Sequence, residues 1–250
     1  TVWQVGWRLR RQSDSCVRRE PAIVARLERA ANHLADAGYR NRSRSYGSLV
    51  RATCCENVCA VDLTDGMLAK TRELAVQKGI SNLKTRIADA ENLPFDDEFC
   101  DLLTCRLAFH HFQHPDKALA EFARVLKPRS VMGFSDNFTV EDPLAARYYN
   151  EYETIRDPSH HWVAPLSELK QMITEAGFEI RATRKLSREF EFHAWADRQR
   201  VSDSDKQRLL QMMREIPQAL TPLFRPRFTD ETMYFSLSEV VIVAKKTDDT

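Results

Sequence analysis

Residues 58–68 read VCAVDLTDGML, and this stretch decides the fold. The apolar run 58–61 predicts a short buried strand that ends at Asp62. Thr64 is a favoured helix N-cap residue, and Gly79 is a favoured residue just past a helix end. Apolar side chains recur between them at helical spacing, so we expect a helix directly after the strand. That helix face comprises Met67, Leu68, Thr71, Leu74 and Ala75.

Toward the C-terminus, strands and helices continue to alternate. Residues 83–87 alternate apolar and polar side chains, as a half-buried strand does. Further strands are expected at 100–105 and 131–136, and between them Pro115 opens a helix that ends before Pro128. This order predicts an α/β fold with a doubly wound, mostly parallel sheet and helices on both faces.

The C-terminal half is less regular. Strands are expected at 178–183 and 239–245, with a helical stretch at 204–216 between them. We therefore expect a C-terminal helical cap, inserted at about 185–232 before the final strand.

The N-terminal part differs in composition from the rest of the chain. Residues 1–56 hold eleven Arg, no Lys and five acidic residues, a net charge of +6, whereas residues 57–250 carry −5. We interpret 1–56 as an atypical basic N-terminal segment, ordered mainly as a helix over Pro21–Ala37, and 57–250 as the main domain.

The overall composition narrows the possible partners. The 250 residues are 43% hydrophobic with a net charge of +1, which favours a globular core and disfavours a general nucleic-acid binder. No stretch approaches the roughly 20 apolar residues of a membrane span, and we see no apolar leader. We expect a cytoplasmic protein. Its six cysteines lack the spacing of a disulfide scaffold or a zinc site, so we expect free thiols and no metal.

Carboxylates follow two successive strands of the predicted sheet. Asp62 ends one strand and Asp89 follows the next. Ligands of open parallel sheets bind outside the carboxyl ends of the strands, and a carboxylate there can accept both ribose hydroxyls of a nucleotide. Leu63 and Met67 would then cover an adenine face. Taken alone, each Asp is explained by capping a helix or forming a turn. The two in series, one strand apart, favour a ligand site more than either does alone.

Residues 57–162 resemble the class I S-adenosylmethionine-dependent methyltransferases of the ubiquinone/menaquinone-biosynthesis type. The similarity lies in a series of short motifs that stand in the family's order and spacing. These are VDLTDGML at 61–68, ADAENLPF at 88–95, FCD at 99–101, CRLAFHHF at 105–112, ARVLKP at 123–128, EDP at 141–143 and RDPSH at 156–160.

The resemblance implies a Rossmann-like fold and an enzyme that transfers a methyl group from S-adenosylmethionine to an O, N or C nucleophile of a small molecule. It implies that Asp62 holds the cofactor ribose and that Asp89 with Ala90 reads the adenine. It also implies that Cys105 and Arg106 line the methionine end of the cofactor.

The family's glycine-rich loop is not recognisable. It would fall near residues 38–47, where the chain offers no G-x-G string. Glycine allows the backbone to approach the cofactor closely, so Arg and Tyr there should loosen the site. Two alternatives stay open: a non-catalytic binding protein that kept the fold, and, ranked last, a nucleotide-dependent dehydrogenase, whose G-x-G-x-x-G string is also absent. Arg129-Ser130 likewise replaces the family's Gly-Gly turn.

Two histidines follow the strand at 100–105. His110 or His111 could serve as a general base on a phenol or quinol, because imidazole titrates near neutral pH. A packed or hydrogen-bonded role in shaping the cofactor pocket is the favoured interpretation. With His114 they do not complete a recognisable metal-ligand pattern.

Overall fold

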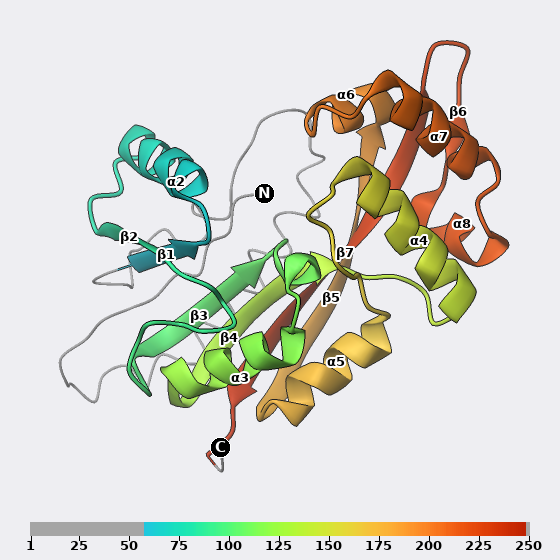
Figure 1. Ribbon diagram of the computed structural model, residues 1–250. Helices are drawn as coiled ribbons and strands as arrows, with labels where there is room; N and C mark the ends of the chain where they lie inside the picture. The colour runs from blue at the N-terminus through green and yellow to red at the C-terminus, as the bar shows by residue number, and fades with distance from the viewer. Residues whose placement is uncertain (1–57, 249–250) are drawn as a thin grey trace. The chain divides into compact units, whose positions relative to one another are not determined.

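The computed structural model of the protein describes residues 58–248 (Figure 1). The predicted Pro21–Ala37 helix and the basic segment 1–56 lie outside the described residues. The chain divides into two compact units. The first contains the described residues up to Asp136, then Gln171–Arg184 and the C-terminal residues from Val241, and the second contains Asn137–Lys170 and Lys185–Val240.

The first unit opens with the βαβ unit predicted from residues 58–68. Strand β1 (Val58–Asp62) is followed by helix α2 (Asp65–Gln77) and strand β2 (Leu83–Ile87). The two strands are parallel, with Asp62 opposite Ile87, so both chain segments leave the sheet at the same edge (Figure 1). Thr64 occupies the N-cap position but makes no side-chain cap bond, because its hydroxyl donates to Asp62 instead.

A five-stranded sheet forms the other part of the α/β architecture. Its strand order is β3-β4-β7-β5, with β6 paired antiparallel to β7, and β3 and β4 are parallel. Helices interleave with these strands, and the expected Rossmann-like α/β fold is confirmed. The strands are β3 (Cys100–Arg106), β4 (Leu126–Asn137), β5 (Phe178–Glu191), β6 (Arg227–Phe228) and β7 (Met233–Lys246).

Helix α3 (Pro115–Val125) supplies a buried face to the first unit. Pro115 stands in the first turn, where its missing N–H costs nothing. Leu119 and Phe122 are both fully buried, so the helix is held by its apolar stripe. The helix ends at Val125, and β4 begins at once rather than at residue 131 as predicted.

The second unit is largely helical and has an aromatic core. Trp195 stacks on Tyr152 with ring centroids 5.5 Å apart and meets the edge of Phe235 at 4.9 Å. The expected insertion at about 185–232 falls in this unit and contains helices, and its boundaries stay a prediction. The helices with residues in this unit are α4 (Pro143–Arg156), α5 (Leu166–Glu175), α6 (Phe192–Asp197), α7 (Asp203–Arg214), η4 (Gln218–Leu220) and α8 (Thr221–Phe224).

No helix within residues 58–248 is long and apolar enough to cross a membrane.

Candidate functional site

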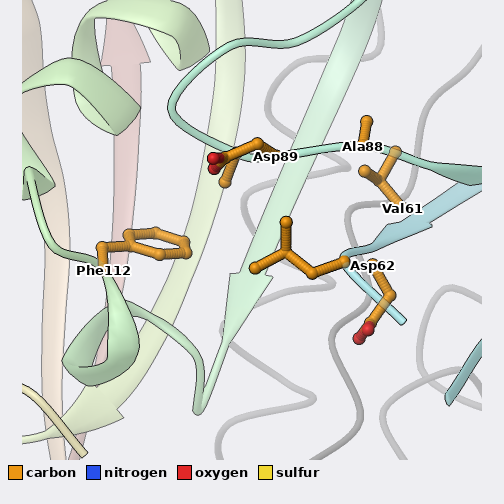
Figure 2. A pocket seen from close by; sticks show the side chains of 7 residues that line it. Val61, Asp62, Ala88, Asp89 and Phe112 are labelled. Carbon is orange, nitrogen blue, oxygen red and sulfur yellow. The ribbon is translucent and has the colours of Figure 1, made fainter. Parts of the chain in front are cut away.

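A pocket lies at the carboxyl ends of β1 and β2. The last two residues of β1, the residue after it and three residues that follow β2 form most of its lining, and Phe112 completes it (Figure 2). The strands are parallel neighbours, and the N–H of Ala88 donates to the carbonyl of Asp62 at 3.1 Å, which ties the two chain exits together. The lining residues are Val61, Asp62, Leu63, Ala88, Asp89, Ala90 and Phe112.

Asp62 is the buried carboxylate of this pocket. Its side chain belongs to a residue only 3% exposed, and Oδ1 accepts hydrogen bonds from the backbone N–H and the hydroxyl of Thr64, both at 2.8 Å. Oδ2 is also buried and has no hydrogen-bond partner among residues 58–248. A buried carboxylate oxygen without a hydrogen-bond partner costs free energy, and this oxygen can accept a further hydrogen bond.

Asp89 presents a second carboxylate on the β2 side of the pocket. It is exposed, and its Oδ1 accepts from the N–H of Glu91 at 2.9 Å, which folds the loop into a tight turn. Ala90 is buried beside it, at 8% exposure, whereas Leu63 is 60% exposed. The pocket therefore combines two carboxylates with small and apolar walls.

Three of the predicted cofactor residues do not line this pocket. Met67 is half-buried on α2, Arg106 is half-buried at the end of β3, and Cys105 is 2% exposed within β3. Burial raises the pKa of the Cys105 thiol well above its ordinary range, so this side chain is a packed apolar group. The structure brings Asp62, Leu63, Asp89 and Ala90 together; the roles of all seven residues stay predictions.

Comparison with known proteins supplies the family. Residues 43–134 match the family described as a methyltransferase domain. The uncharacterized methyltransferase YcgJ of Bacillus subtilis is 31% identical over 170 residues, which cover 68% of this chain and 66% of YcgJ. The crystal structure of a methyltransferase candidate from Bacillus halodurans is 32% identical with a TM-score of 0.71, over 76% of this chain and 82% of that one. The chain belongs to this methyltransferase family.

A further relative fits the resemblance seen in the sequence. The ubiquinone/menaquinone biosynthesis C-methyltransferase UbiE of Ectopseudomonas mendocina is 30% identical over 172 residues, which cover 60% of this chain and 66% of UbiE. The chain thus spans about two thirds of the length of YcgJ and of this UbiE.

His110 and His111 lie in the short helix η3 (Phe109–His111). The ring Nδ1 of His110 lies 2.5 Å from Oδ1 of Asp136, and the rings of His110 and His111 are 4.2 Å apart. His110 is therefore hydrogen-bonded, and its role in shaping a cofactor pocket stays a prediction because it does not line the pocket described above. Its pairing with a carboxylate is also the geometry of an oriented base. Within residues 58–248, no group of three His, Cys, Asp or Glu side chains could hold a metal ion.

Sequence reasoning missed two residues of this region. Phe112 lines the pocket but reads in the sequence as ordinary core, since an apolar residue after a helical turn is common. Asp136 is 2% exposed at the carboxyl-terminal part of β4. Its signal was available, because it ends a predicted strand at 131–136 as Asp62 ends 58–61.

The loop that follows the pocket is clamped to α3. Arg124 donates to the carbonyls of Leu93 and Phe95 at 2.9 and 2.7 Å, and Glu121 accepts from the N–H of Leu93 at 2.6 Å. Arg124 and Glu121 also pair with each other at 2.7 Å. The hydrogen bond from Arg124 is the main cause that holds the pKa of Glu121 below its ordinary value. These contacts join the motif at 88–95 to α3 and to the motif at 123–128, which begins in that helix.

The motifs at 141–143 and 156–160 build the second unit. Asp142 caps α4 by accepting from the N–H of Ala145 at 2.8 Å. The buried Asn150 accepts from the N–H of Val163 at 2.6 Å and pairs with His160 Nε2 at 2.8 Å. Because the Asn150 oxygen is an acceptor, His160 must donate, which fixes its tautomer. These residues order the chain after α4.

Proposed function

We propose that this methyltransferase binds S-adenosylmethionine at the pocket between β1 and β2 and methylates an O, N or C nucleophile of a small molecule. The observation that carries the proposal is the buried Oδ2 of Asp62, which has no hydrogen-bond partner within the described residues 58–248. A ribose hydroxyl is a donor of the kind this atom lacks, and Asp62 stands at the strand end where α/β proteins hold nucleotides.

The neighbouring residues suit the rest of such a cofactor. Asp89 is available to accept from an exocyclic adenine amine, and Ala90 leaves room for a flat ring because its side chain is small. Phe112 offers an apolar wall. When bound, S-adenosylmethionine supplies an electrophilic methyl group on a sulfonium. The chain's own contribution is to hold and orient the two substrates, and orientation can supply much of the rate.

We further infer that the affinity is modest. The sequence lacks a recognisable G-x-G loop, and each lost hydrogen bond costs about 1 kcal/mol. Dissociation constants roughly in the micromolar to millimolar range follow. The same absence favours the second candidate function, a non-catalytic relative that acts as a binding protein.

The test is titration calorimetry with S-adenosylhomocysteine on the wild type and on Asp62→Ala. A hydrogen bond to a charged acceptor is worth roughly 1.5–3 kcal/mol, so Asp62→Ala should weaken binding about tenfold or more. Asp65→Ala is the matched control, because Asp65 is exposed in the first turn of α2 and pairs with Arg72. Its affinity should equal that of the wild type.

Chemical denaturation of the same variants separates the alternatives. If Asp62 were only a turn residue, Asp62→Ala would lower the free energy of unfolding by about 1 kcal/mol and leave the dissociation constant unchanged. Absence of any heat at saturating S-adenosylhomocysteine and S-adenosylmethionine would support the non-catalytic candidate instead.

A further inference from the structure

The loop after β3 contains a strained backbone conformation that other interactions must stabilise. Leu107 has φ +47°, a left-handed conformation that costs a non-glycine residue roughly 1–2 kcal/mol. Its N–H donates to the carbonyl of Ser135 at 2.7 Å. The conformation directs the next three N–H groups toward one point, which is the arrangement of an anion-binding nest.

The side chain of Asp136 occupies that point. Its Oδ2 accepts from the N–H groups of Ala108, Phe109 and His110 at 3.0, 2.7 and 3.3 Å. Its Oδ1 meets Nδ1 of His110 at 2.5 Å. Three backbone N–H donors converge on Oδ2, which is the arrangement that a carboxylate accepts, and a carboxylate Oδ1 can only accept from Nδ1 of His110. Hydrogen bonds to a charged group are strong enough to offset the strain at Leu107.

The same loop carries the pocket wall. The N–H of Phe112 donates to the carbonyl of Phe109 at 3.0 Å, and their rings meet edge to face at 5.5 Å. Phe112 also packs edge-on against Phe122 of α3, at 6.3 Å. The position of Phe112 in the pocket therefore depends on the backbone that Asp136 holds.

We propose that Asp136 is a positioning residue that sets two features of the site at once: the Phe112 wall of the cofactor pocket and the tautomer of His110. This inference rests on the proposed function for its cofactor. One oxygen of Asp136 holds the loop that carries Phe112, and the other accepts the Nδ1 proton of His110. With its proton on Nδ1, the imidazole has Nε2 as its basic nitrogen, and a neutral imidazole of this tautomer can act as a proton acceptor.

The test compares Asp136→Asn with the wild type by two measurements. Asparagine keeps the shape of the side chain but has only one carbonyl oxygen. That oxygen can accept either from the backbone N–H groups or from the His110 ring, and the amide nitrogen must then face the other partner. Titration with S-adenosylhomocysteine should show binding weakened about tenfold, because a wall displaced by a fraction of an ångström loses its contacts. The ¹⁵N NMR signals of the His110 ring should change from an Nδ1-protonated pattern to a mixed one.

Asp101→Asn is the matched control. Asp101 lies near the other end of β3 and pairs with Lys127 at 3.0 Å, so its variant removes a partly buried carboxylate without touching the loop. It should keep both the wild-type affinity and the wild-type His110 signals. A variant Asp136→Asn that binds like the wild type, or keeps its His110 signals, overturns the positioning role.

A second variant covers the case in which Asp136→Asn does not fold. Phe112→Leu should weaken S-adenosylhomocysteine binding while leaving the His110 signals as in the wild type, and unchanged affinity would overturn the wall assignment. Failure of the proposed function looks different. The wild type itself would then not bind, and its His110 ring would still show Nδ1 protonated.

Discussion

Two aspartates at strand ends show how one residue type serves two purposes. Asp62 uses one oxygen for Thr64 and leaves the other buried without a partner in the described part of the chain. Asp136 has both oxygens engaged by the loop after β3. The first arrangement suits a ligand and the second holds a backbone. The two roles differ because the groups around each carboxylate differ. For Asp136 one of these groups, the N–H of Phe109, lies 27 residues away in the sequence, so a strand-end pattern alone cannot distinguish the two roles.

This explains which site residues could be predicted. Asp62 and Asp89 follow from the βα pattern, because parallel strands place their exits at one edge. The strand-end pattern also marks Asp136, but its role and that of Phe112 depend on a bend at Leu107 that no residue type indicates. A leucine with positive φ is disfavoured, and the sequence offers no glycine there.

Arg129 is a second residue in a conformation that favours glycine. It has φ +63° and lies inside strand β4, where the sequence comparison expected a turn and where Arg-Ser stands in place of Gly-Gly. We expect Arg129→Gly to raise the free energy of unfolding by about 0.5–1 kcal/mol, since relief of the strain outweighs the added freedom of the unfolded chain. The ion pair it removes, to Asp248, is exposed and contributes little. Urea unfolding measures the difference.

Arg181→Gly is the comparison for that variant. Arg181 lies in β5 and also forms an exposed pair, with Glu179. Glycine within a strand is destabilising, so this change should lower the free energy of unfolding by roughly 0.5–1 kcal/mol. Equal effects from both variants would show that backbone strain at Arg129 is negligible.

At the scale of elements, the alternation of strands and helices is predictable and the element ends are not. The helix from Pro115 and the strand at 100–105 match α3 and β3 closely because strong apolar patterns define them. Strand β4 begins five residues early, at Leu126. Its pairing with β3 shifts register between Cys100 and Leu102, and this irregularity accommodates the positive φ of Arg129 within the strand. A bulge of this kind depends on the partner strand.

Glu121 and Arg124 of α3 hold the loop that follows the pocket, and these contacts should make the free energy of unfolding depend on pH. Glu121 has a pKa below its ordinary 4.5, caused first by the hydrogen bond from Arg124. A lowered folded pKa adds stability above the unfolded pKa, and that contribution is lost as pH falls through the folded pKa. We therefore expect Glu121→Gln to lower the free energy of unfolding by about 1 kcal/mol at pH 7, with the gap narrowing below about pH 4.5.

Unfolding in urea at pH 7, 5 and 3.5 checks this expectation. Glu179→Gln removes an exposed carboxylate of β5 and should show a small difference from the wild type at every pH. A Glu121→Gln gap that widens toward acid would contradict the assigned direction.

At the scale of the whole molecule, neither compact unit is one continuous piece of sequence. The chain passes from the first unit to the second and back more than once, and the elements α5, β5 and β7 contain residues of both. A linear reading of composition finds segments, such as the insertion at 185–232, but not which distant segments share a core. That depends on long-range pairing such as β4 with β7, which joins residues about a hundred positions apart in sequence.

The buried cysteines of the first unit give a test of the molecule as a whole. Cys100 is fully buried and Cys105 is 2% exposed, and burial raises the pKa of both thiols well above 9.0. Only the thiolate reacts with iodoacetamide, so the native protein should resist labelling at both positions at pH 8. Labelling then requires unfolding of the protein. A ligand that binds only the native state slows the labelling by the factor 1 + [L]/Kd. Peptide mass spectrometry should show about tenfold protection by S-adenosylhomocysteine at ten times its Kd, and Asp62→Ala should lose that protection at the same concentration. Rapid labelling of Cys105 in the absence of denaturant would show that β3 opens locally. Equal protection in Asp62→Ala and the wild type would show that Asp62 does not contribute to ligand binding and would contradict the proposed location of the binding site.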